Sequence, residues 1–195
     1  VNGLTGNRRI IPKTVPYQIY RRFLRCLDRL AFVDRPSPRD STAPALYIGG
    51  CSNGGFMTMK QIIFNPSRYA AAYPVCEALA DAFISDEDIL KLKDLPIWFT
   101  HAKTDPVVVP DDFVVPTYER LAKVNPNAHF TYWDKVLDHT GTQKNADGTP
   151  FEYIGHWSWI PMLNDECVLD YDGKPVMTDG KETPILEWMA AQKKA

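Results

Sequence analysis

The sequence predicts an α/β protein in which a mostly parallel sheet carries helices on both faces. Two observations predict it. Short apolar segments recur four times with helical segments between them, and a glycine-rich turn joins the first apolar segment to the helix that follows. Alternation of strands and helices is typical of parallel sheets. The length of 195 residues and the 45% hydrophobic content fit one domain, 1–195, with a sizeable core.

The elements follow from apolar runs and helical periodicity. We expect strands at 45–49, 69–75, 96–101 and 128–133. We expect helices at 56–64, 86–93, 111–124, 157–164 and 184–192. A polar, glycine-containing loop is expected at 137–155. Ligands of such sheets bind at the carboxyl ends of the strands, so functional residues are expected there.

The first 44 residues differ from the rest. Residues 15–33 have the spacing of an amphipathic helix, and residues 1–40 hold nine Lys and Arg against three Asp. A basic helix face is our interpretation, and a helix that binds nucleic acid or a membrane is the alternative. The net charge of −2 gives no sign of nucleic-acid binding. No apolar run approaches the roughly 20 residues that a membrane span needs. No signal peptide is recognised, so the compartment stays open between cytoplasmic and secreted.

A nucleophile motif follows the first expected strand. Gly50-Cys51-Ser52-Asn53-Gly54 fits G-x-S-x-G between a strand and a helix. Ser52 is the expected nucleophile, and the Asn53 backbone N–H is the expected oxyanion donor. The positions two before and two after the serine must hold small residues, because strand and helix approach closely there. Gly50 and Gly54 meet this requirement. The alternative is a glycine-rich turn of another α/β fold, such as a phosphate site.

A serine needs a general base and an acid that orients the base. In the chain order serine, acid, histidine, Asp105 follows the third strand and is the expected acid. Asp134 and Asp138 are rival acids. His156, which follows a glycine, is the expected base, and His139 is its rival.

The remaining histidines and the cysteines predict no further chemistry. His101 is expected to pack and His129 to be structural. The four cysteines, at positions 26, 51, 76 and 167, match no zinc-binding spacing, so no metal is expected. A disulfide between Cys76 and Cys167 is a further hypothesis.

Four segments around these residues carry a family resemblance: YIGGCSNGGFMTMK (47–60), YPVCEAL (73–79), PIWFTHAKTDPVVVPDDFVVPTYER (96–120) and GHWSWIPMLNDEC (155–167). From about Leu46 to about Gln192 the chain resembles bacterial esterases of the α/β-hydrolase superfamily. These are similar to prolyl-oligopeptidase catalytic domains and to polyhydroxybutyrate depolymerase-like esterases. The resemblance implies the α/β-hydrolase fold and a triad of Ser52, Asp105 and His156. It also implies hydrolysis of a small-molecule ester through an acyl-enzyme, without a cofactor.

Residues 1–44 depart from that family. They lack the strands that precede the serine and the His-Gly loop that gives a second oxyanion donor. We therefore expect a fold truncated at its N-terminal side, with weak activity or self-association through an uncovered sheet edge. The leading function is a serine esterase. The alternatives are a prolyl-oligopeptidase-like peptidase and an inactive fragment or pseudoenzyme that acts as a binding module.

Overall fold

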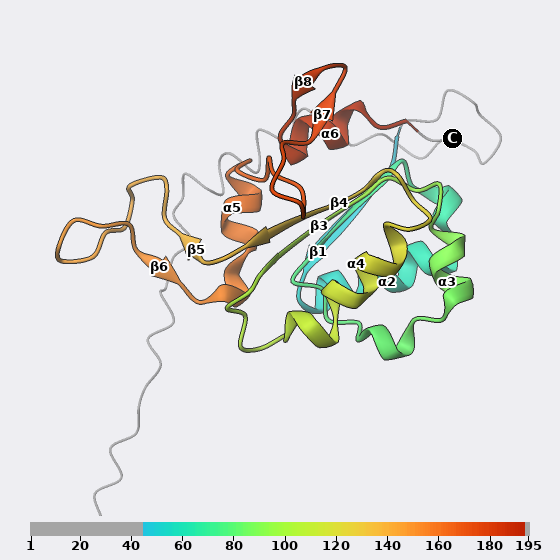
Figure 1. Ribbon diagram of the computed structural model, residues 1–195, viewed down its shortest axis with the longest axis horizontal. Helices are drawn as coiled ribbons and strands as arrows, with labels where there is room; N and C mark the ends of the chain where they lie inside the picture. Colours follow the sequence, from blue (N-terminus) through green and yellow to red (C-terminus); the bar gives the residue numbers. More distant parts are fainter. Residues whose placement is uncertain (1–44, 194–195) are drawn as a thin grey trace, which may run out of the picture.

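The computed structural model describes residues 45–193, whose centre is a parallel four-stranded sheet (Figure 1). Its strands are β1 (Tyr47–Cys51), β2 (Ala71–Val75), β3 (Ile97–Ala102) and β4 (Ala128–Trp133). They lie side by side in chain order, and all three neighbouring pairs are parallel. The expected helix at 15–33 lies outside the described residues.

Within residues 45–193, the α-helices that connect or follow these strands are α2 (Asn53–Phe64), α3 (Asp86–Lys91), α4 (Val114–Leu121), α5 (Trp159–Leu163) and α6 (Ile185–Ala191). The same part of the chain has short 3-10 helices at η1 (Pro66–Arg68), η2 (Asp81–Phe83), η3 (Pro110–Asp112) and η4 (Gly155–Trp157). Two small hairpins pair β5 (Val136–Leu137) with β6 (Glu152–Tyr153) and β7 (Met177–Thr178) with β8 (Lys181–Glu182). The expected loop at 137–155 therefore contains most of a hairpin.

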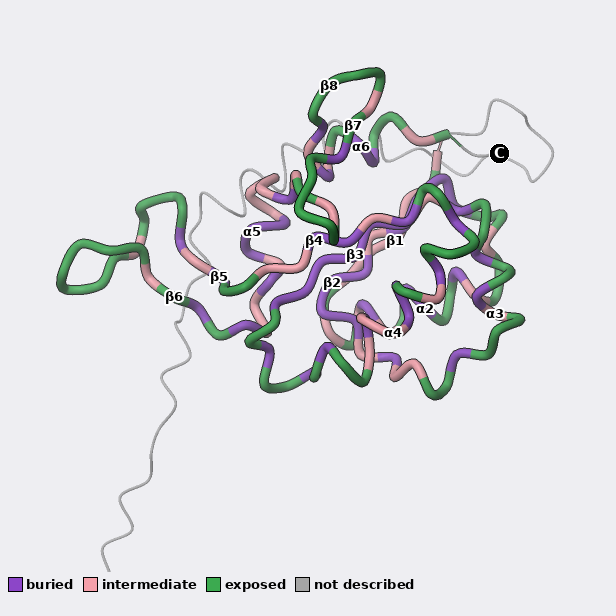
Figure 2. Tube along the Cα trace, in the orientation of Figure 1, coloured by how far each residue is buried: buried purple, intermediate pink, exposed green. Residues whose placement is uncertain are grey.

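Apolar side chains cover both faces of the sheet. Successive strand residues point to opposite faces, so Phe99 joins the core beneath α2, α3 and α4, whereas Trp98 joins the core beneath α5 and α6. Every residue of β3 is buried (Figure 2). A strand buried on both faces is an almost continuous apolar run, so the polar Thr100 and His101 stand out in this one.

Two expected helices are shorter than the sequence predicts. The segment 111–124 divides at Phe113, where φ is −124° and ψ is −95°, into η3 and α4. The segment 157–164 divides into η4 and the five-residue α5. Pro116 and Pro161 each lie at the third position of a helix, where the missing N–H has no intrahelical acceptor to lose.

The carboxyl ends of β1, β2 and β3 lie at one edge of the sheet because the strands are parallel. Ser52 follows β1 directly, Cys76 follows β2 directly, and Asp105 lies three residues beyond β3. Residues that are far apart in the sequence therefore meet at this edge, which is where ligands bind in open α/β sheets. None of the helices within residues 45–193 is both long and apolar enough to cross a membrane.

Candidate active site

Ser52 occupies a sharp turn between β1 and α2. Its φ of 57° and ψ of −114° are strained for a residue with a Cβ, and such strain is concentrated at functional sites. Two hydrogen bonds hold the turn. The Ser52 N–H donates to the Val75 carbonyl at 3.0 Å, and the Phe56 N–H donates to the Ser52 carbonyl at 2.9 Å. Asn53 is the first residue of α2, so its N–H is one of the helix donors without an intrahelical partner.

The glycines around Ser52 differ in the room that each position leaves for a side chain. A Cβ at Gly50 would lie 2.9 Å from the Gly54 backbone, so Gly50 meets the close approach that the motif predicts. A Cβ at Gly54 would meet nothing within 4 Å among the described residues. At Gly55 it would lie 2.7 Å from the Glu77 Cα. The helix residue that must stay small is therefore Gly55, because β2 passes behind the first turn of α2.

This difference predicts opposite effects for two alanine substitutions in one helix turn. Gly55→Ala should lower the free energy of unfolding by about 1–3 kcal/mol, since the new methyl group overlaps backbone atoms. Gly54→Ala should leave it unchanged or raise it by up to about 1 kcal/mol, since alanine favours helix. Urea unfolding of both variants measures the difference. Equal losses in the two variants would contradict the close contact at Gly55.

Asp105 is the best-bonded carboxylate of the site. Its Oδ1 accepts the backbone N–H groups of Val107 at 2.8 Å and Val108 at 3.0 Å. Its Oδ2 lies 2.9 Å from His156 Nδ1 and 3.0 Å from His101 Nε2. Burial raises the pKa of Asp105, but these hydrogen bonds outweigh burial and hold the pKa at about 2. The carboxyl group is therefore an anion at neutral pH.

His156 reaches Asp105 because its segment packs tightly on the loop after β3. It lies in η4, and a Cβ on the preceding Gly155 would lie 2.3 Å from the Thr104 carbonyl carbon. Only glycine fits this approach without a backbone shift. An ionised carboxylate can only accept, so the bond to Asp105 places a proton on His156 Nδ1 and leaves Nε2 free to accept another.

Cys76 connects the serine turn to the histidine. It has a positive φ of 35°, and its thiol donates to the His156 carbonyl at 3.4 Å. Burial raises the pKa of the thiol to about 12, although the Ser52 backbone N–H opposes this. The ligand atoms of Cys76, Asp105 and His156 lie within 4.8 Å of one another and could hold a metal ion. Two of these three residues, Asp105 and His156, are already hydrogen-bonded to each other, so their closeness needs no metal ion.

The rival residues have other partners. Asp138 accepts from the Thr140 and Gln143 N–H groups and from the Tyr153 hydroxyl, so it organises the loop after β5. The other two rivals are paired, Asp134 with Lys103 and His139 with Glu166. His129, which was expected to be structural, pairs with Asp170. These residues are therefore paired with groups other than Asp105, whereas His156 is hydrogen-bonded to the Asp105 carboxylate.

Two expectations about other residues need correction. His101 does not only pack, because its Nε2 is hydrogen-bonded to the candidate acid. The Cys76–Cys167 disulfide is wrong, since both are free thiols. Cys167 instead lies 3.6 Å from the Thr100 hydroxyl, in the core beneath α6. The spacing of cysteines in the sequence carries no information on these two environments.

Glu77 is a buried carboxyl group behind the serine turn. Its Oε2 accepts the Leu79 N–H at 2.8 Å, and its Oε1 has no hydrogen-bond partner among the described residues. Burial raises the pKa of Glu77 to about 8, although the Leu79 N–H opposes this. The group is therefore mostly protonated in the folded chain at neutral pH.

The raised pKa of Glu77 predicts a pH-dependent loss of stability. The unfolded chain releases this proton near the ordinary glutamate pKa of 4.5, whereas the folded chain keeps it to about pH 8. The free energy of unfolding is therefore highest, as far as Glu77 determines it, below pH 4.5 and falls as the pH rises towards 8. Glu77→Gln should remove a loss on the order of a few kcal/mol between about pH 5 and pH 8. Urea unfolding at both pH values measures it. The exposed Glu87→Gln is the control; parallel pH profiles for all three proteins would contradict the prediction.

The sequence matches no family model and no curated protein. Among solved structures the chain is similar to a thermostable esterase, with 25% identity and a TM-score of 0.50 over 76% of this chain and 34% of that one. It is also similar to a CIB-like hydrolase from Thermoplasma acidophilum, with 15% identity and a TM-score of 0.36 over 58% of this chain and 47% of that one. A third similar structure is acyl-protein thioesterase 2 of Zea mays, with 15% identity and a TM-score of 0.39 over 68% of this chain and 60% of that one.

The first of these likenesses carries the conclusion on the fold, and the two weaker ones add nothing to it. The chain spans about a third of the length of that esterase. Together with the parallel sheet, the helices on both faces and the turn after β1, this likeness shows an α/β-hydrolase fold.

Proposed function

From the α/β-hydrolase fold we propose that this chain is the catalytic part of a serine hydrolase that cleaves carboxylic esters through Ser52, Asp105 and His156. The observation that carries the proposal is the 2.9 Å hydrogen bond between His156 Nδ1 and the buried Asp105 carboxylate. The strained turn at Ser52 supports it, because the Ser52 N–H donates to the Val75 carbonyl, and the next residue, Cys76, donates its thiol to the His156 carbonyl. The esterase to which the chain is similar supports ester hydrolysis as the reaction class.

In the first half of the reaction His156 Nε2 takes the proton of the Ser52 hydroxyl as Ser52 Oγ attacks the ester carbonyl carbon. The Asp105 carboxylate stabilises the imidazolium that forms. The carbonyl oxygen becomes an oxyanion, and the Asn53 N–H at the start of α2 donates to it. His156 then returns the proton to the leaving alcohol as the C–O bond breaks, which leaves Ser52 acylated.

In the second half water takes the place of the alcohol. His156 Nε2 removes a proton from the water, whose oxygen attacks the acyl carbon. The tetrahedral intermediate collapses, His156 gives the proton to Ser52 Oγ, and the carboxylic acid leaves. The balance needs only ester and water, and no cofactor enters.

Hydrolysis of p-nitrophenyl acetate and butyrate by the purified chain, beside a p-nitroanilide of a proline-containing peptide, tests the reaction class. We expect release of nitrophenol from the esters at a rate well above that of the peptide amide. Faster cleavage of the amide would favour the peptidase alternative. No turnover of either substrate by a folded chain would favour the binding-module alternative.

We also propose that the chain associates with itself through β1. Within residues 45–193 this strand pairs only with β2, and most of its residues are half-buried, unlike those of β3. An open edge presents unpaired backbone groups to another strand. Size-exclusion chromatography with light scattering at two concentrations should give a mass above 22.1 kDa. A monomer at both concentrations would refute self-association and leave the proposed chemistry untouched.

A further inference from the structure

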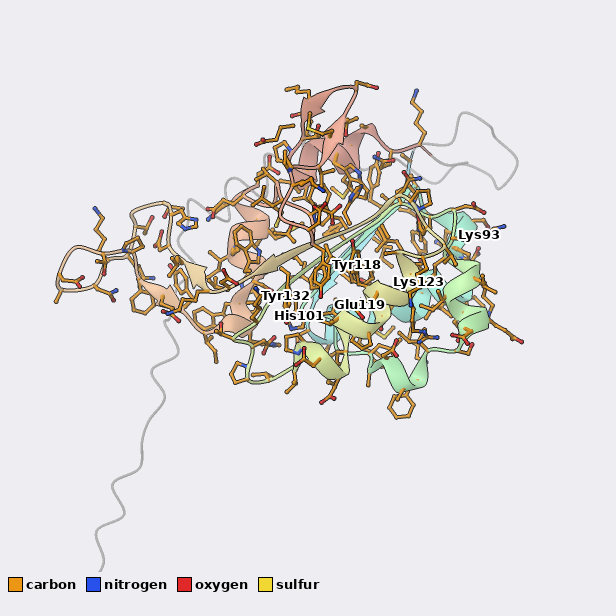
Figure 3. All side chains as sticks on the ribbon, in the orientation of Figure 1. Lys93, His101, Tyr118, Glu119, Lys123 and Tyr132 are labelled. Carbon is orange, nitrogen blue, oxygen red and sulfur yellow. The ribbon has the colours of Figure 1, made fainter. Side chains whose placement is uncertain are left out.

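His101 is a buried polar residue next to the triad that the reaction above does not use. It lies in β3, one residue before the strand ends, and its side chain is fully buried. Its Nε2 lies 3.0 Å from Asp105 Oδ2 and 3.0 Å from the Val108 carbonyl oxygen. Figure 3 labels His101, which belongs to a strand of the sheet.

These contacts locate the ring proton of His101. The Val108 carbonyl can only accept, so Nε2 carries a proton and donates it to both oxygens. The other ring nitrogen, Nδ1, is buried and has no partner among the described residues. A second proton there would leave a charged N–H without an acceptor, which is costly. The ring is therefore neutral, with its proton on Nε2.

The two oxygens of Asp105 are held in different ways. Backbone N–H groups of the following loop hold Oδ1, so its position follows from the fold of that loop. Oδ2 is the oxygen that faces the catalytic base, and the backbone bonds do not reach it. Among the described residues, His101 is the group other than His156 that donates to Oδ2.

We propose that His101 is a positioning residue that fixes Asp105 Oδ2 for His156 and takes up part of its negative charge. The inference rests on the proposed triad. Because His101 sits on an inner strand of the sheet, its hold on Oδ2 does not depend on the His156 segment. The titratable groups that the structure places against Asp105 are His101 from β3, His156 from η4 and Cys76 from the end of β2.

Two substitutions separate positioning from packing. His101→Leu fills the space without a donor, whereas His101→Gln places an amide N–H near the former Nε2. We expect the leucine variant to lose about 10–100-fold in kcat with little change in KM, a loss of the size seen when a residue that orients a metal ligand is replaced. The acidic limb of its kcat/KM profile should move to higher pH, since an Oδ2 without its donor attracts the imidazolium more strongly. The glutamine variant should recover most of kcat and of the pH profile.

A residue that only packs would behave differently. Both variants would then lower the melting temperature while kcat and the acidic limb stay at their wild-type values, and that result would overturn the proposal. A folded glutamine variant no more active than the leucine variant would overturn it as well.

A measurement on the wild-type chain covers the case in which the leucine variant does not fold. In 15N spectra of histidine-labelled protein near neutral pH, we expect the His101 signals of a ring protonated at Nε2 and bare at Nδ1. A proton on Nδ1 would overturn the proposal. This readout needs no turnover, so it stays informative if the chain proves to be no hydrolase, which active-site labelling of Ser52 would show separately.

Discussion

Ser52→Ala should abolish ester hydrolysis, with a fall in kcat of about 10⁴–10⁶-fold and little change in KM. The substitution removes only the nucleophilic oxygen, because alanine has the same Cβ in the strained turn and the Ser52 N–H bond to Val75 is a backbone bond. Steady-state kinetics with p-nitrophenyl butyrate measure the fall.

Ser67→Ala is the matched control for that substitution. Ser67 is exposed in η1, which precedes β2. It therefore lies at the amino ends of the parallel strands, whereas Ser52 lies at their carboxyl ends. Its hydroxyl donates to the Asn65 side chain, and kcat should stay at the wild-type value. A Ser52→Ala protein with more than a tenth of wild-type kcat would show that another residue carries the reaction.

Asp105→Asn should lower kcat by about 10⁴-fold through the wrong tautomer of His156. The asparagine oxygen can still accept the Val107 and Val108 N–H groups, so its NH₂ group replaces Oδ2. That NH₂ can only donate, which moves the His156 proton from Nδ1 to Nε2. A protonated Nε2 cannot accept the serine proton. The same NH₂ also faces the donor His101 Nε2, so some loss of stability is expected.

The control for the acid is Asp134→Asn, because Asp134 is the exposed rival that the sequence offers and it pairs with Lys103. Exposed pairs of this kind contribute little, so both kcat and the free energy of unfolding should stay close to wild type. A larger loss of kcat in Asp134→Asn than in Asp105→Asn would reverse the assignment of the acid.

Strand positions followed well from the sequence. The strand at 128–133 has the expected bounds. The strand expected at 69–75 begins two residues later, and the one expected at 96–101 is displaced by one residue at both ends. The first strand, expected at 45–49, begins and ends two residues later, at Tyr47–Cys51, and its register with β2 continues through Cys51. Apolar runs report burial on both faces, and burial on both faces is what a central parallel strand requires.

The outer contacts of the site did not follow from the sequence. His101 and Asp105 are four residues apart, yet they meet because the loop after β3 turns back on the strand end, and no local pattern encodes that turn. A histidine within a mostly apolar buried strand was the available signal. The tight contact of Gly55 did not follow from the sequence either, since its close neighbour Glu77 belongs to the connection after β2.

The most direct test of the proposed triad is labelling of the intact chain with a fluorophosphonate, followed by mass spectrometry of its peptides. These reagents form a stable bond to a serine only where a base and an oxyanion donor activate it. We expect one adduct, on Ser52, that is absent from Asp105→Asn under the same conditions. A folded chain that stays unlabelled, or that is labelled at another residue, would contradict Ser52 as the nucleophile.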